Sequence, residues 1–337
     1  MLNLFGDPTI WLPLAFAGLM GLSILIYVVL DGFDLGIGML FALANEREQD
    51  RMMAAIGPFW DANETWLVLA VGLLLVAFPL AHGIILSTLY LPVVLMLIGI
   101  ALRGVAFEFR AKAEGRTKRL WSRIFIFGSF LMSLSQGYML GVYVMGLEQT
   151  PATLAFGALT AICLVAGYML VGATWLIIKT EGDLQQRAIH WALRSLVFAA
   201  IGMAAISIAS PLVSPRIFEK WFGGATILLL APLPVGSAAI FIGLAVFLRN
   251  MTPAHDRWSR LPFICVTGLF ALAFTGLAYS FYPYVVPDRI TLFEAASAPE
   301  SLLVILIGAL VVLPAIIGYS ALSYHVFRGK ATPLSYD

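Results

Sequence analysis

Long apolar stretches alternate with short polar segments from one end of the chain to the other. Most of these stretches are about 20 residues or longer, the length that an α-helix needs to cross a bilayer. No polar segment is long enough to fold separately, so the pattern predicts one integral membrane domain, 1–337, of the all-α class. The nine predicted transmembrane helices are 9–43, 53–80, 84–110, 121–145, 152–179, 191–212, 224–249, 261–283 and 301–327.

The composition supports a membrane protein. Hydrophobic residues make up 61% of the chain and charged residues 12%, whereas an average soluble domain is about 25% charged. The net charge of +1 gives no reason to expect a nucleic-acid partner. The first residues, MLNLFGDPTIW, lack the basic segment of a cleaved signal peptide, so we expect the first helix itself to direct insertion.

Basic residues gather on one side of the predicted membrane domain. Most of the 20 Lys and Arg fall in every second loop along the chain, and these loops lie on the same predicted side of the membrane. Arg216, Lys220 and Arg289 lie on the opposite side. Loops rich in Lys and Arg stay in the cytoplasm. We therefore expect the N-terminus outside and the C-terminus in the cytoplasm. The loops predicted to be cytoplasmic are 44–52, 110–123, 179–194, 249–260 and the C-terminal tail.

Four carboxylates interrupt the first two apolar stretches. YVVLDGFDLGIGML, 27–40, carries Asp31 and Asp34, and FWDANETWLVLAVG, 59–72, carries Asp61 and Glu64. Residues at i and i+3 share a helix face, so each pair is expected to point in one direction. Because ionised side chains facing lipid are costly, both faces are expected to point into protein or toward a water-filled cavity. The glycines of DGFDLGIG predict a close approach between helices.

Arg103 is the one basic residue predicted inside a span, and Glu108 lies near the end of the same helix. All these charges have overlapping depths, so one cluster in the cytoplasmic half of the membrane can contain them. An arginine keeps its proton and needs a carboxylate partner, whereas neighbouring carboxylates can hold protons near neutral pH. Two roles stay open, a proton relay and a buried ion network that fixes the helices together. The proton-path candidates are Asp61, Asp31, Asp34 and Glu64, and the structural charges are Arg103 and Glu108.

The chain offers no pattern for a redox cofactor, a metal ion or a catalytic residue of its own. None of His82, His190, His255 and His325 falls in the middle of a predicted span, and no two have ligand spacing. Neither a phosphate-binding loop nor a nucleophile elbow occurs. We therefore expect this chain to bind no haem.

Several motifs resemble subunit II of the cytochrome bd-type quinol oxidases. They occur in family order along essentially the whole chain, and the short length resembles the cyanide-insensitive branch. The matching stretches are LDGFDLGIGML, GPFWDANETWLVLAVG, LRGVAFEFR, GATWLIIKTEGDLQQRA, SFYPYVVP and TLFEAAS.

The resemblance implies a fold of two four-helix bundles plus one extra helix, in the bacterial inner membrane. It also implies one subunit of a quinol:oxygen oxidoreductase that reduces dioxygen to water and takes up protons from the cytoplasm. Haem b and haem d, or a b-type variant, are then held by subunit I, the partner in a heterodimer. Small single-helix subunits, and a quinone or lipid in a groove of this subunit, are further implied partners.

The resemblance also assigns roles to residues. Asp61, in FWDAN, matches the aspartate that family members use in the proton route to the oxygen-reducing haem. Asp31 and Asp34 map onto family positions, and Arg103 matches the intramembrane arginine of the family. Glu64 departs from the amide that the best-known members carry there.

Two other functions fit the same charges. A stand-alone proton-coupled transporter also places acids inside the membrane, but it would often show broken helices and internal repeats. Here the charges lie in the first third of the chain, and no second half matches it. A purely structural scaffold subunit would carry the same charges without moving protons.

Overall fold

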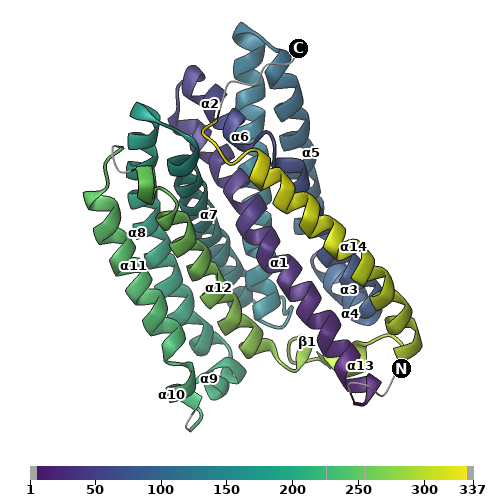
Figure 1. Cartoon of the computed structure of the whole chain (residues 1–337). Helices are drawn as coiled ribbons and strands as arrows, with labels where there is room; N and C mark the ends of the chain where they lie inside the picture. The colour runs from purple at the N-terminus through teal and green to yellow at the C-terminus, as the bar shows by residue number, and fades with distance from the viewer. Residues whose placement is uncertain (1–5, 225, 254–255, 332–337) are drawn as a thin grey trace.

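The computed structural model describes residues 6–224, 226–253 and 256–331. Within these ranges nine helices are long and apolar enough to cross a membrane, which confirms the predicted all-α fold (Figure 1). The long helices are α1 (Pro8–Leu40), α3 (Trp60–Ala77), α5 (Tyr90–Lys112), α6 (Gly115–Val144), α7 (Pro151–Lys179), α8 (Gly182–Val213), α11 (Pro232–Asn250), α12 (Leu261–Phe281) and α14 (Pro299–Val326).

Short elements join the long helices. A two-stranded antiparallel sheet and a four-residue helix lie between α12 and α14. The short elements are η1 (Phe41–Leu43), α2 (Glu46–Ile56), α4 (Pro79–Thr88), α9 (Pro215–Phe222), α10 (Thr226–Leu230), η2 (Asp256–Trp258), β1 (Tyr284–Val286), β2 (Ile290–Thr291) and α13 (Leu292–Ala295).

The long helices form two groups that meet where α7 packs against α6 and α1. One group contains α1, α3, α5 and α6, and the other contains α7, α8, α11 and α12 (Figure 1). The remaining helix, α14, crosses the outside of α1 and α3, and Leu302 is its one buried residue. α14 is therefore held loosely by this chain alone.

The contact between α1 and α7 depends on glycine. A Cβ on Gly36 would collide with the Tyr168 carbonyl oxygen, and one on Gly172 would lie 2.7 Å from the Ile37 nitrogen. The close approach predicted for the glycines of α1 is therefore present, with α7 as the neighbour. It fixes the part of α1 that carries Asp31 and Asp34.

The second predicted span, 53–80, is divided into three helices. α2 ends at Ile56 before a turn that contains Pro58, and α3 ends before Phe78, whose φ of −133° and ψ of 59° are not helical. Proline cannot donate to the helical ladder, and it disfavours helical geometry in the preceding residue. Pro79 therefore starts the separate helix α4, so the third crossing begins at Tyr90 instead of residue 84.

Candidate functional site

Arg103 is the centre of a buried ion cluster between α1, α3 and α5. Its side chain is 2% exposed, and its Nη1 atom lies 2.7 Å from Oδ1 of Asp31, which is fully buried. Its Nη2 atom donates a hydrogen bond of 3.3 Å to Oε2 of Glu64. One guanidinium therefore ties two other helices to α5, as the sequence predicted for these three residues.

Asp34 lies one turn further along α1 and is also fully buried. Nδ2 of Asn63 donates to Oδ2 of Asp34 at 2.8 Å, and the Tyr324 hydroxyl donates to Oδ1 of Asn63 at 2.9 Å. Sequence reasoning did not single out Asn63 or Tyr324. An amide inside an apolar span next to acidic residues was the available signal, because a buried carboxylate needs a donor.

Asp61 and Glu108 do not join this cluster. Asp61 is exposed in the first turn of α3, and Glu108 is exposed on α5. Asp61 precedes Glu64 by three residues, which turns its side chain by about 60° around α3. Glu108 follows Arg103 by five residues, which turns its side chain by about 140° around α5. Glu64 is already at the edge of the interior, with its side chain 17% exposed, so the rotation carries Asp61 to the outside.

Arg110 forms a second buried cation that the sequence reading missed. Its Nη1 atom donates to Oδ1 of Asp50 at 2.8 Å, and its Nε atom donates to Oγ of Ser122 at 2.8 Å. Lys118 also contacts Asp50, at 2.9 Å. Hydropathy placed Arg110 in a loop, but α5 continues to Lys112, so the guanidinium lies inside the structure and joins α2, α5 and α6.

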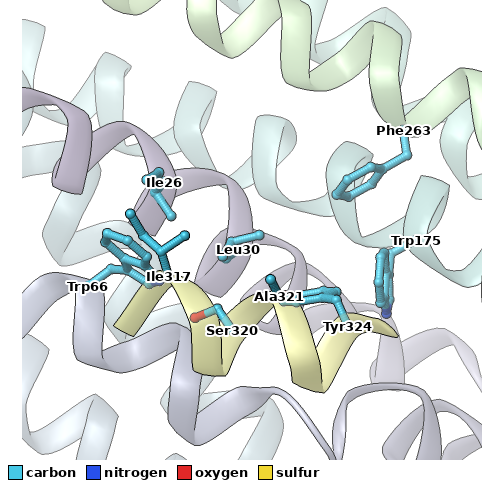
Figure 2. A pocket seen from close by; sticks show the side chains of 9 residues that line it. All are labelled: Ile26, Leu30, Trp66, Trp175, Phe263, Ile317, Ser320, Ala321 and Tyr324. Atoms are coloured by element: carbon cyan, nitrogen blue, oxygen red, sulfur yellow. The ribbon is translucent and has the colours of Figure 1, made fainter. Parts of the chain in front are cut away.

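A groove of about 440 Å³ lies beside the buried acids, between α14 and α1. Figure 2 shows Ile26 and Leu30 of α1 facing Ile317 and Ala321 of α14, with Tyr324 and Trp175 at one end. Tyr324 therefore belongs both to the groove wall and to the hydrogen-bonded chain that ends at Asp34.

No cluster of three or more His, Cys, Asp or Glu in the described ranges has the geometry of a metal site. His82, His190 and His325 belong to α4, α8 and α14, and His255 lies outside the described residues.

Comparisons with known proteins agree along almost the whole chain. The family model for cytochrome bd terminal oxidase subunit II matches residues 12–327. Cytochrome bd ubiquinol oxidase subunit 2 of Bacillus subtilis (strain 168) is 30% identical, over 92% of this chain and 95% of that protein. Cytochrome bd-I ubiquinol oxidase subunit 2 of Escherichia coli (strain K12) is 27% identical, over 93% of each.

A solved structure has the same fold. The match is to the bd oxidase from Geobacillus thermodenitrificans, with a TM-score of 0.71 at 11% identity. The superposition covers 94% of this chain and 98% of the other. At this identity the likeness concerns the arrangement of the helices.

Proposed function

Because this chain belongs to the family of cytochrome bd terminal oxidase subunit II, we propose that it is the haem-free subunit that stabilises subunit I and supplies it with protons through Asp61. The chain is part of a quinol:oxygen oxidoreductase, and it is a multi-pass protein of the bacterial inner membrane. The family membership removes the stand-alone transporter as an alternative.

The exposure of Asp61 is the observation that carries the proposal. An aspartate facing lipid costs up to about 2.5–3.5 kcal/mol on insertion scales. Thr65 and Val68 continue the same exposed stripe of α3, and the Val68 side chain is 69% exposed. A protein surface that covers this stripe would remove Asp61 from lipid, so we assign the stripe to the contact with subunit I.

The depth of Asp61 suits a proton donor. Glu64 contacts Arg103, and Asp61 lies three residues closer to the start of α3, which is about 4.5 Å along the axis. Arg110, about 10 Å along α5 from Arg103, lies near the end predicted to be cytoplasmic. Asp61 would therefore lie between the cytoplasmic surface and the level of the buried cluster.

The buried acids would assist Asp61 from the interior side of α3. Asp31 and Glu64 share the guanidinium of Arg103, and Asp34 is bound by the Asn63 amide, so the three acids of the cluster contact one cation. Such a group of neighbouring carboxylates can hold an exchangeable proton. In this proposal Arg103 keeps the helices in register, while Asp61 passes protons to the partner.

The haems of the complex belong to subunit I in this proposal. The family implies haem in the complex, and haem iron is held mostly by His, Met, Cys or Tyr ligands. Haem b and haem d, or a b-type variant, would then lie across the interface from Asp61. Small single-helix subunits remain a prediction from the resemblance.

Asp61→Asn tests the proposal in the purified complex. Asparagine keeps the size of the side chain but cannot titrate, so we expect normal haem spectra and quinol oxidase turnover at least about tenfold slower. Glu108→Gln is the matched control, because it neutralises another exposed intramembrane acid. Turnover of Asp61→Asn at the parent rate across pH 6–8 would disprove the relay, and failed assembly would favour the scaffold alternative.

A further inference from the structure

A string of hydrogen bonds joins the last turn of α14 to the buried Asp34. Nδ2 of Asn63 donates to Oδ2 of Asp34 at 2.8 Å and to the Leu30 carbonyl oxygen at 3.3 Å. The Tyr324 hydroxyl donates to Oδ1 of Asn63 at 2.9 Å. Asp34 and Asn63 are 0% and 1% exposed, so bulk water does not replace these partners.

Both ends of the Asn63 amide are fixed. A main-chain carbonyl only accepts hydrogen bonds, so the Leu30 carbonyl keeps the amide nitrogen toward α1, while the Tyr324 hydroxyl binds the amide oxygen. A flipped amide would place its oxygen against Oδ2 of Asp34 and against the Leu30 carbonyl oxygen. The string therefore keeps an N–H donor on Asp34.

Asp34 is anchored through one of its two oxygens. Oδ2 accepts from Asn63, whereas Oδ1 makes no hydrogen bond to any of the described residues. A carboxylate oxygen accepts a proton and the resulting hydroxyl donates it again. With Oδ2 held, Oδ1 is the oxygen that can take up and release a proton while the anchor stays in place.

The last turn of α14 is fastened to α7 by the segment 327–331, which we call the strap. Lys179, the last residue of α7, donates from Nζ to the carbonyl oxygens of Phe327 and Gly329, the latter at 3.1 Å. The Ala331 nitrogen donates to the Lys179 carbonyl oxygen at 2.8 Å. Since most of α14 packs loosely, the strap decides where its last turn lies.

Aromatic rings hold the Tyr324 ring independently of its hydroxyl. The ring stacks on Phe59 with 4.6 Å between ring centres. Trp175 meets it edge-on at 5.8 Å, at the end of the groove in Figure 2. Tyr324→Phe therefore removes the hydrogen bond to Asn63 and keeps the packing.

We infer that Tyr324 is a positioning residue that holds the Asp34 carboxylate through Asn63, and that the strap keeps Tyr324 in place. The inference rests on the proposed role of the buried acids in holding protons, but it does not depend on Asp61. Release of the strap from Lys179 would free the Asn63 amide to turn, and Asp34 would lose its anchor. α14 thereby acts on proton exchange from outside the ion cluster.

Infrared redox-difference spectra of the purified complex, recorded beside its turnover, test this inference. The carboxyl band of Asp34 is identified by its loss in Asp34→Asn. We expect Tyr324→Phe to shift this band and to slow turnover roughly threefold to tenfold at an unchanged KM for quinol, because one hydrogen bond of the string is lost. Lys179→Met should shift the band in the same direction, and it keeps the test decisive if Tyr324→Phe does not assemble.

Ser323→Ala is the matched control. Ser323 precedes Tyr324 on α14, and its hydroxyl donates to the Pro58 carbonyl oxygen at 3.2 Å, so this variant also removes one hydrogen bond from the last turn. We expect it to keep the parent turnover and the parent Asp34 band. A lower thermal midpoint in both variants, with the band of Tyr324→Phe unshifted, would show a merely structural role and overturn the inference.

The Asp34→Asn variant separates this inference from the proposed function. If Asp34→Asn turns over at the parent rate, or if the parent spectrum contains no Asp34 band, the proton-holding role of the buried acids fails together with this inference. If Asp34→Asn is slow while Tyr324→Phe keeps the parent band and rate, the positioning role alone is overturned.

Discussion

At the scale of single residues, the ion pairs of Arg103 matter because their loss would leave the Asp31 and Glu64 carboxylates without a cation. Arg103 is 2% exposed and is held by Asp31 and Glu64 in apolar surroundings. A buried ion pair adds little net stability when it is intact, but removing one partner leaves an uncompensated charge. The arginine therefore locks the register of α1, α3 and α5.

Replacing Arg103 with leucine should destabilise the packing of α1, α3 and α5. We expect Arg103→Leu to cost about 3–5 kcal/mol, because Asp31 and Glu64 lose their cation. The yield of assembled complex and its haem content measure the loss. Arg123→Leu, at an exposed position of α6, is the control. Normal assembly of Arg103→Leu would rule out the structural role.

Part of the site could be predicted from residue spacing. The i, i+3 rule and the depth argument correctly brought Asp31 and Glu64 to Arg103. They failed for Asp61 because spacing gives the relative direction of two side chains, but not where the edge of the buried face lies. Asn63 and Arg110 were missed because only tertiary packing shows which polar groups become buried donors.

At the scale of helices, the contact between α1 and α7 leaves no room for a side chain at Gly36. We expect Gly36→Ala to separate the two helices at a cost of about 1–3 kcal/mol or more, because the methyl group would meet the backbone of Tyr168. The thermal midpoint of the purified complex measures the effect. Gly18→Ala, also on α1, meets no atom within 4 Å. If Gly36→Ala and Gly18→Ala have the same thermal midpoint, the close contact does not govern stability.

Hydropathy predicted all nine crossings but not all of their ends. It averages over many residues, so the apolar turn between α2 and α3 and the break before Pro79 both read as one continuous span. α2 itself is polar at its start, where Asn45 and Glu48 form reciprocal capping hydrogen bonds of 2.8 and 3.0 Å. The capping pattern and the prolines indicate these helix boundaries in the sequence, but an average over apolar residues does not use them.

At the scale of the whole molecule, two exposed surfaces have different proposed occupants. The stripe of α3 that carries Asp61 is assigned to subunit I, and we assign the exposed apolar side chains of α14 to lipid. A spin label at Val68→Cys should therefore be shielded from membrane-dissolved oxygen in the complex. A label at Val304→Cys, on α14, should be accessible, since Val304 is 70% exposed.

Both labelled variants need Cys163 and Cys265 replaced by alanine, since both are free cysteines. Comparable oxygen accessibility at the two positions would place the partner elsewhere. The relay through Asp61 would then lose its route, because no protein surface would receive the proton.

Proton uptake during a single turnover is the most direct test of the relay through Asp61, because it follows the proton itself. The fully reduced complex is mixed rapidly with oxygen, and a pH dye records proton uptake while absorbance follows the haems. With Asp61→Asn, we expect oxygen to bind at the parent rate while proton uptake slows at least about tenfold, and we expect Asp61→Glu to restore most of the rate. Parent-rate proton uptake in Asp61→Asn would show that Asp61 passes no proton to the haems.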